Sequence, residues 1–158
     1  MKSGISILFL FSLVFLLACS DGENTKKIFG TEGNKTSKNK MIVERNIDPI
    51  QYSKGQKLFL TNCASCHGKY GEGAEDWRKP DEKGNNPPPP LNGTGHSWHH
   101  STNSLTNTIK NGTAKIGGNM PAWGDKLSDS EIRLILVWIK SQWPDELYTA
   151  WYNRFHQK

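Results

Sequence analysis

Aliphatic and phenyl side chains are scarce in this sequence of 158 residues. Leu, Ile, Val and Phe occupy 33 positions, and 11 of these lie within the first 18 residues. The other 140 residues contain 22 of them, about 16%, which is below the rough 20% at which a chain tends to stay disordered. Six Trp and four Tyr residues fill part of a core. Because these aromatic residues leave the rest of the core unfilled, the composition favours a large apolar cofactor in the interior.

Cysteine count, length and charge each argue against a class of protein. Three cysteines is an odd number, which speaks against a simple disulfide scaffold. A length of 158 residues suits one ordinary domain, which argues against an enzyme with separate cofactor and substrate domains. The net charge of +5 does not indicate nucleic-acid binding, because two acidic groups on a cofactor would cancel the excess of the C-terminal part.

Residues 1–18 have the pattern of an export signal. Lys2 precedes an apolar run from Ile5 to Ala18, which is short for a bilayer span of about 17 to 25 residues and ends at a small residue. The end of the run and the next residue, Leu16-Leu17-Ala18-Cys19, resemble a bacterial lipoprotein box. This resemblance implies cleavage before Cys19 and lipid attachment to it. A simple signal peptide with an unmodified Cys19, or an uncleaved anchor, is the alternative.

Residues 19–46 are predicted to form a flexible tether. They are rich in Lys, Asn, Gly, Thr and Ser and show no hydrophobic periodicity. A flexible chain of this length has a typical end-to-end distance of roughly 30 Å. The tether would therefore let a folded domain, residues 47–158, move over a membrane surface.

Cys63, Cys66 and His67 form the Cys-x-x-Cys-His pattern by which haem c is attached covalently. The two thiols reach two vinyl groups on one porphyrin edge, and the next residue then places its imidazole under the iron. A zinc site would need a fourth ligand and usually a second paired motif, and a thioredoxin-like pair would follow a strand. Residues 52–62 instead predict a helix, in which Gly55 marks a close crossing by another helix.

From about residue 47 to residue 143 the sequence resembles the class I c-type cytochromes. Met120 lies in a Gly-rich loop that a proline ends, which is where this family keeps its axial thioether ligand. The resemblance implies an all-α fold of about three to five short helices around one haem. This haem would be bound covalently through Cys63 and Cys66 and ligated by His67 and Met120. A core residue that fills a gap is the alternative role of Met120.

Four consecutive prolines, residues 87–90, precede Leu91. In the family, a proline two places before a leucine offers its carbonyl to the proximal histidine, and this spacing points to Pro89 and Leu91. Such a bond would fix the tautomer of His67 and raise its basicity towards iron. A stiff connector is the alternative, because four prolines leave the register open.

Residues 101–110 predict a helix that Asn111-Gly112 stops. Leu105 and Ile109 lie four positions apart, on one face of this helix. The family arrangement implies that these two side chains cover one face of the haem.

A capping box at Ser128 predicts the start of a strongly apolar helix over residues 132–140, which should end near Trp143-Pro144. This helix resembles the family's C-terminal helix, which crosses the N-terminal one. Trp138 is the candidate to lie over Gly55.

A C-terminal extension begins at about residue 144. Leu147, Trp151 and Phe155 form a stripe with a spacing of four, which predicts a further short helix outside the usual family pattern. Packing of this helix back onto the domain is one interpretation, and a docking face for a partner is the other.

Three histidines, His96, His99 and His100, surround Trp98 within five residues. They could bind copper or zinc, or supply an alternative axial ligand. A histidine cluster alone lacks the carboxylate or thiolate partners of a specific metal site, so exposed or propionate-contacting histidines fit better. Trp98 is a candidate to donate its indole hydrogen to a haem propionate.

The sequence thus predicts a one-electron carrier rather than an enzyme. Both axial positions would stay occupied, so no small-molecule substrate is expected. The expected partners are a redox protein donor and acceptor, and a membrane held through a lipid on Cys19. Lys69 and Lys115 are candidate steering charges for the redox partners, and ordinary solvated lysines are the alternative. The expected location is the bacterial cell envelope, with the domain in the periplasm or on the extracytoplasmic face. The alternatives are a haem enzyme or gas sensor with a displaceable Met120, and a copper-handling protein built on the histidine cluster.

Overall fold

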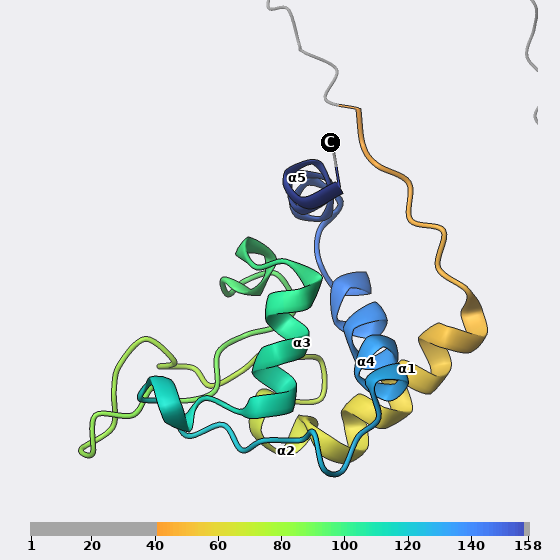
Figure 1. Ribbon diagram of the computed structural model, residues 1–158. Coiled ribbons are helices and arrows are strands. Elements are labelled where there is room, and N and C mark those ends of the chain that lie inside the picture. Colours follow the sequence, from red (N-terminus) through yellow and green to blue (C-terminus); the bar gives the residue numbers. More distant parts are fainter. Residues whose placement is uncertain (1–40, 157–158) are drawn as a thin grey trace, which may run out of the picture. The chain divides into compact units, whose positions relative to one another are not determined.

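Five α-helices and two short 3₁₀ turns form the regular structure of residues 41–156, which the computed structural model describes. In chain order they are α1 (Pro49–Asn62), α2 (Ala64–His67), η1 (Ser97–His99), α3 (Thr102–Asn111), η2 (Ala114–Ile116), α4 (Asp129–Ser141) and α5 (Asp145–His156). No strand occurs in this part of the chain, and the predicted all-α fold is confirmed (Figure 1). The expected signal peptide, Cys19 and most of the expected tether lie outside the described residues.

The core is built where α1 crosses α4 (Figure 1). A Cβ atom at Gly55 would collide with the carbonyl of Leu134 and lie 3.2 Å from Cβ of Trp138. Glycine therefore permits this close approach, and the predicted position of Trp138 over Gly55 is confirmed. The rings of Phe59 and Trp138 then pack with their centroids 4.1 Å apart. The remaining buried side chains of α4 are those of Ile132, Ile135, Leu136 and Ile139.

Side-chain caps fix where the helices begin. The Ser128 hydroxyl accepts a hydrogen bond from the Glu131 N–H at 3.3 Å, and the Glu131 carboxylate accepts one from the Ser128 N–H at 2.8 Å. This is the predicted capping box of α4. The first helix begins three residues earlier than expected, because the Asp48 carboxylate accepts from the Ile50 N–H at 2.8 Å and Pro49 suits the first turn.

The predicted C-terminal helix is present as α5, and it packs back onto the domain. Trp151 is buried, and Phe155 packs against the same hydrophobic cluster. The Trp151 indole donates to the carbonyl of His100 at 3.0 Å, and the Trp143 indole, just before α5, donates to the carbonyl of Leu91 at 2.8 Å. Trp143 and the extension therefore brace the two ends of the loop that runs from residue 91 to residue 100.

Residues 43–45 were expected at the end of the tether, but they contact α4 and α5. The Val43 N–H donates to the buried hydroxyl of Thr149 at 3.0 Å. The Arg45 guanidinium lies 4.5 Å from the centre of the Tyr148 ring. It also donates to Asp145 and to the carbonyls of Lys140, Ser141 and Trp143. Because Arg45 satisfies the last carbonyls of α4, the folded domain begins before the expected boundary at residue 46.

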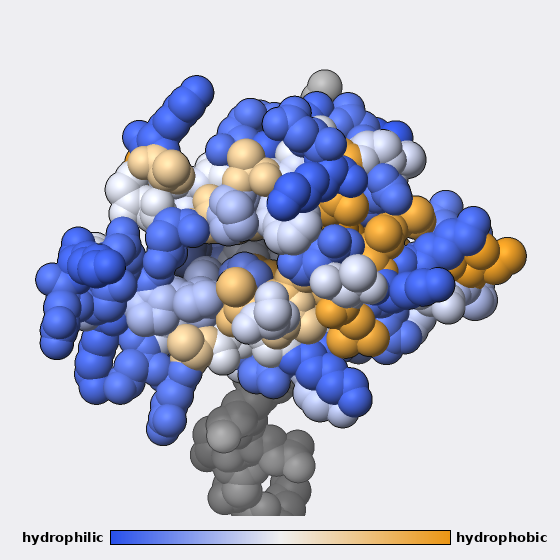
Figure 2. All heavy atoms as spheres, turned by 90° about the horizontal axis from the view of Figure 1, so that it is seen from below, coloured by the Kyte–Doolittle hydropathy of each residue, from blue (hydrophilic) through white to orange (hydrophobic). Residues whose placement is uncertain are grey.

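The surface carries several exposed apolar side chains. Ile50, Leu60, Tyr70 and Ile116 are among them. The face drawn in Figure 2 is mostly hydrophilic, has hydrophobic residues gathered towards one side, and is hollowed near its middle. None of the helices in residues 41–156 is long and apolar enough to cross a membrane.

Candidate haem site

The Cys-x-x-Cys-His segment is wound into one short helical turn, α2. The carbonyl of Cys63 accepts hydrogen bonds from the N–H groups of Cys66 at 3.1 Å and His67 at 2.9 Å. Cys63 is half-buried, Cys66 is exposed, and neither is in a disulfide. His67 ends the turn and is only 9% exposed. The turn therefore presents two unmodified thiols and a buried imidazole within five residues.

The carbonyl oxygen of Pro89 lies 3.0 Å from Nδ1 of His67. The family resemblance implied this contact for Pro89, with a stiff connector as the alternative. Since a carbonyl oxygen can only accept, Nδ1 of His67 must donate and therefore carries a proton. A neutral imidazole in this tautomer keeps its lone pair on Nε2, which is then the nitrogen available to a metal.

Backbone hydrogen bonds hold the proline run beside the loop that follows His67. The Ala74 N–H donates to the carbonyl of Pro88 at 2.9 Å, and the Leu91 N–H donates to the carbonyl of Gly71 at 2.7 Å. These two bonds bracket Pro89 on both sides. They fix the register that the sequence of four prolines left open.

Gly73 permits the close approach of these two segments. Its φ of 70° lies in the left-handed region, and a Cβ there would lie 2.5 Å from the Pro90 nitrogen and 2.6 Å from the Pro89 carbonyl carbon. Any larger residue would push the proline run away. The position of the Pro89 carbonyl at His67 therefore depends on a glycine at residue 73.

Burial keeps both Cys63 and His67 uncharged. It raises the pKa of the Cys63 thiol to about 11, and the neighbouring Cys66 acts in the same direction. Burial lowers the pKa of His67, while its hydrogen bond to the Pro89 carbonyl opposes the shift. The imidazole is therefore neutral near pH 7, as an iron ligand must be.

The loop that carries Met120 is closed against the end of α3. The Thr113 N–H donates to the carbonyl of Met120 at 3.0 Å, and the Met120 N–H donates to the Thr113 hydroxyl at 3.0 Å. Gly112 has a φ of 66°, and a Cβ there would lie 2.5 Å from the Met120 carbonyl oxygen. The Met120 side chain is partly buried and packs against the hydrophobic core. Its role as an axial ligand stays a prediction.

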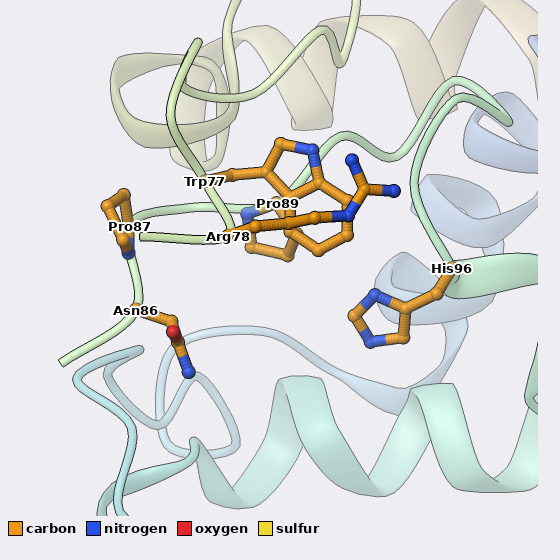
Figure 3. Close-up of a pocket in the computed structure, with 6 residues that line it drawn as sticks. All are labelled: Trp77, Arg78, Asn86, Pro87, Pro89 and His96. Carbon is orange, nitrogen blue, oxygen red and sulfur yellow. The ribbon is translucent and has the colours of Figure 1, made fainter. Parts of the chain in front are cut away.

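A cavity of about 420 Å³ shares Pro89 with the His67 contact. It is lined by Trp77, Arg78, Asn86, Pro87, Pro89 and His96 (Figure 3). Figure 3 shows Trp77 and Arg78 on one side of this cavity and the His96 imidazole across from them. The sequence analysis missed Trp77 and Arg78. The signal in the sequence that could have identified them as cavity-lining residues is a tryptophan beside an arginine in an otherwise polar loop.

The remaining candidate residues lie around the same core. Ile109 is buried, and Leu91, Trp98 and Leu105 pack against the hydrophobic cluster. The Trp98 ring packs against His99 in a tilted arrangement, with a centroid separation of 3.7 Å and an interplanar angle of 30°. The proposed contacts of these side chains with a haem stay predictions.

The histidine segment does not gather a metal site. No group of three or more His, Cys, Asp or Glu residues able to hold a metal ion occurs within residues 41–156. His96 lies edge-on to His100, with ring centroids 5.6 Å apart. The described residues therefore give the copper alternative no support.

The residues present fit haem c. His67 offers Nε2 with its proton held on the other nitrogen, two free thiols precede it at the attachment spacing, and a thioether lies in a closed loop. The cavity beside Pro89 adds a cation and polar groups next to this site. An all-helical domain with this arrangement is a c-type cytochrome domain.

Comparison with known proteins agrees with this class. The family model described as "Cytochrome C oxidase, cbb3-type, subunit III" matches residues 51–139, and the chain belongs to this family. The chain is 36% identical over 88 residues to a cbb3-type cytochrome c oxidase subunit FixP of Azorhizobium caulinodans, a match that covers 54% of this chain and 25% of that protein. It is 30% identical over 103 residues to subunit CcoP of Rhodobacter capsulatus, covering 60% of this chain and 30% of that one.

Among solved structures, cytochrome CL of Methylophaga aminisulfidivorans is similar at 24% identity and a TM-score of 0.49, covering 67% of this chain and 65% of that one. The matches to the curated relatives span only 25–30% of those proteins. Family membership assigns this domain electron transfer and covalently attached haem c.

Proposed function

We propose that the domain transfers one electron at a time through a single haem c bound to Cys63 and Cys66, with His67 and Met120 as axial ligands. The observation that carries this proposal is the 3.0 Å contact between His67 Nδ1 and the Pro89 carbonyl. It orients the imidazole, holds its proton on Nδ1 and leaves Nε2 for iron. A bound haem supplies an iron that alternates between the ferric and ferrous states.

The residues around the site restrict its chemistry to electron transfer. His67 and Met120 would hold the iron of a bound haem from both sides, which would leave no open coordination site for a substrate. A thioether ligand favours the ferrous state and raises the potential relative to two imidazoles. Ile109, which lies in the hydrophobic cluster, and Leu105, which packs against it, would help exclude water from the haem face.

The electron donor and acceptor are proposed to be redox proteins of the bacterial envelope. The relatives are named as subunits of cbb3-type cytochrome c oxidases, so a membrane oxidoreductase complex is the favoured partner class. Lys69 and Lys115 are exposed and are candidate steering charges. A lipid on Cys19 would keep the domain at the membrane, and Cys19→Ser is then expected to release it from membranes. Continued detergent-dependent partitioning of that variant would rule out this anchor.

A methionine exchange tests the ligand set. Met120→Ala is expected to remove the weak far-red sulfur-to-iron band and to allow rapid binding of carbon monoxide to the reduced protein. Met41→Ala is the matched control, because Met41 is 86% exposed and should leave both observations unchanged. An unchanged band in Met120→Ala would assign the sixth ligand elsewhere. Rapid carbon monoxide binding by the unmodified protein would favour a gas sensor or haem enzyme.

A further inference from the structure

The loop that ends at Met120 is held by hydrogen bonds to one residue, Thr113. The Thr113 N–H donates to the carbonyl of Met120 at 3.0 Å, and the Thr113 hydroxyl accepts from the Met120 N–H at 3.0 Å. The Thr113 carbonyl accepts from the N–H groups of Ile116 at 2.9 Å and Gly118 at 3.0 Å. Thr113 therefore bonds, through both its backbone and its side chain, to residues 114–120, which we call the methionine loop.

Apolar packing contributes little to the outer part of the methionine loop. Residues 114–117, which include the turn η2 that follows α3 in Figure 1, are exposed, and the Ile116 side chain is 81% exposed. A segment with few buried apolar contacts opens locally at a low cost in free energy. The hydrogen bonds of Thr113 therefore supply much of the stability of the closed loop.

The neighbouring residues confine the Thr113 hydroxyl to its place beside Met120. A Cβ atom at Gly118 would collide with the hydroxyl oxygen and the Cβ atom of Thr113, so a glycine at this position leaves room for the side chain. Pro121 has no N–H, so the last N–H group of the loop before Ala122 is that of Met120. The Thr113 hydroxyl is the acceptor for this group.

We propose that the Thr113 hydroxyl is a positioning group that keeps the Met120 thioether on the haem iron. This inference rests on the proposed function, in which Met120 is the sixth ligand. Thr113 holds the Met120 backbone at both its N–H and its carbonyl, so the thioether can leave the iron for long only when this part of the loop opens. The frequency of opening then sets how often another ligand can reach the iron.

The test measures how fast the reduced full-length holoprotein binds carbon monoxide at saturating concentration. This limiting rate reports departure of the sulfur, because the iron–sulfur bond must break before the bond to carbon monoxide forms, with no change in oxidation state. Thr113→Val keeps the branched shape of the side chain and removes its hydroxyl. It is expected to raise the rate about tenfold, the factor that corresponds to loss of one hydrogen bond.

Two further observations separate positioning from general stability. The sulfur-to-iron band and the midpoint potential of Thr113→Val should stay those of the unmodified protein, because the closed loop still dominates. Thr113→Ser keeps the hydroxyl and should restore a rate close to that of the unmodified protein. A Thr113→Ser protein as fast as Thr113→Val would overturn the inference.

Thr108→Val is the matched control. The Thr108 hydroxyl donates to the carbonyl of Ser104 at 3.0 Å, so the same exchange removes one hydrogen bond within α3 and none of the methionine loop. Its rate should be unchanged. Equal acceleration in Thr108→Val and Thr113→Val would reflect general destabilisation and would overturn the inference. An unchanged rate in Thr113→Val, even with a lower unfolding midpoint, would also overturn it, because the hydroxyl would then have only a structural role.

A second variant covers the case in which Thr113→Val fails to take up haem. Gly118→Ala keeps Thr113 in the sequence and displaces its side chain, because the added Cβ collides with it. This variant is also expected to bind carbon monoxide faster. Asn119→Ala is the control, because Asn119 is next to Gly118 in the same loop and is exposed. An unchanged rate in Gly118→Ala, or equal acceleration in Asn119→Ala, would overturn the inference.

Failure of the proposed function gives a different result. A Met120→Ala protein that keeps the sulfur-to-iron band would assign the sixth ligand elsewhere, which would refute both the ligand set and the role of Thr113. Loss of the band in Met120→Ala together with an unchanged rate in Thr113→Val would refute the role of Thr113 alone.

Discussion

The α1–α4 helix pair and the haem-binding segment, residues 63–101, are stabilised in different ways. The helix pair is closed by apolar packing, from Phe59 to the buried face of α4. None of the ten buried hydrophobic side chains of the described residues lies in the haem-binding segment. Backbone hydrogen bonds hold that segment, together with the indoles of Trp143 and Trp151 from outside it. Packed side chains thus form the part of the core at the helix pair. The bound haem is expected to fill the part beside the haem-binding segment.

Removal of the attachment thiols should give the largest effect. In Cys63→Ala with Cys66→Ala, covalent haem is expected to be lost completely, as a haem stain after denaturing electrophoresis would show. Without haem, the amides of the haem-binding segment should lose protection from hydrogen exchange more than those of α4, because the segment buries too little apolar surface of its own.

Ser65→Ala is the matched control for this pair, since Ser65 lies between the two cysteines and is exposed. It should keep the haem stain. A stain that persists in the double variant, or equal loss of protection in α4 and in the haem-binding segment, would contradict the comparison.

One methyl group added where α1 crosses α4 should lower the stability of the helix pair. Gly55→Ala gains about 1 kcal/mol of helix propensity. The new Cβ would collide with the Leu134 carbonyl, and overpacking of this kind costs about 1–3 kcal/mol or more. We expect a net loss of about 2 kcal/mol, measured by denaturant unfolding followed by circular dichroism.

Lys54→Ala is the matched control, because Lys54 is next to Gly55 in sequence and is exposed on α1. It should change the free energy of unfolding by less than about 0.5 kcal/mol. The optical spectrum of Gly55→Ala should stay that of the unmodified protein, because the crossing lies outside the haem-binding segment. Equal or greater stability of Gly55→Ala would show that the helices can move apart without cost.

Local signals made the helices predictable from the sequence. The Ser128 capping box marked the start of α4, and the crossing of Gly55 by Trp138 followed from helix spacing and the family resemblance. Pro89 was identified through the family resemblance, which implies a proline two places before a leucine. In each of these places, residues a few positions apart carry the information.

Contacts between distant residues account for what the sequence analysis missed. Arg45 was assigned to the tether because its partners, the last carbonyls of α4, lie about 95 residues away. Trp77 and Arg78 line the cavity only because the loop between residues 74 and 88 is closed by the bond from Ala74 to Pro88. No local pattern marks the path of such a loop.

Gly73→Ala should lower the stability of the haem-binding segment and change its haem spectrum. Gly84→Ala is the matched control: its φ is 80°, and no atom lies within 4 Å of an added Cβ. Both variants carry the cost of a left-handed residue, about 1–2 kcal/mol. We expect Gly73→Ala to be less stable than Gly84→Ala by about 1.5 kcal/mol, because only its Cβ meets the proline run.

The displaced proline run should also loosen the Pro89 contact with His67. Only Gly73→Ala is therefore expected to alter the haem spectrum and to speed carbon monoxide binding. Identical spectra and identical binding rates in the two variants would show that the Pro89 contact does not restrain the haem ligand.

The smallest effect is expected at the start of α4. Ser128→Ala removes the hydroxyl that caps the Glu131 N–H, and loss of such a cap costs about 1 kcal/mol. Ser53→Ala on the exposed face of α1 is the control, because its hydroxyl makes no hydrogen bond in the described residues. The unfolding midpoint of Ser128→Ala should fall while its reduction potential stays constant. A shifted potential would mean that the helix pair and the haem-binding segment are coupled more closely than their separate packing indicates.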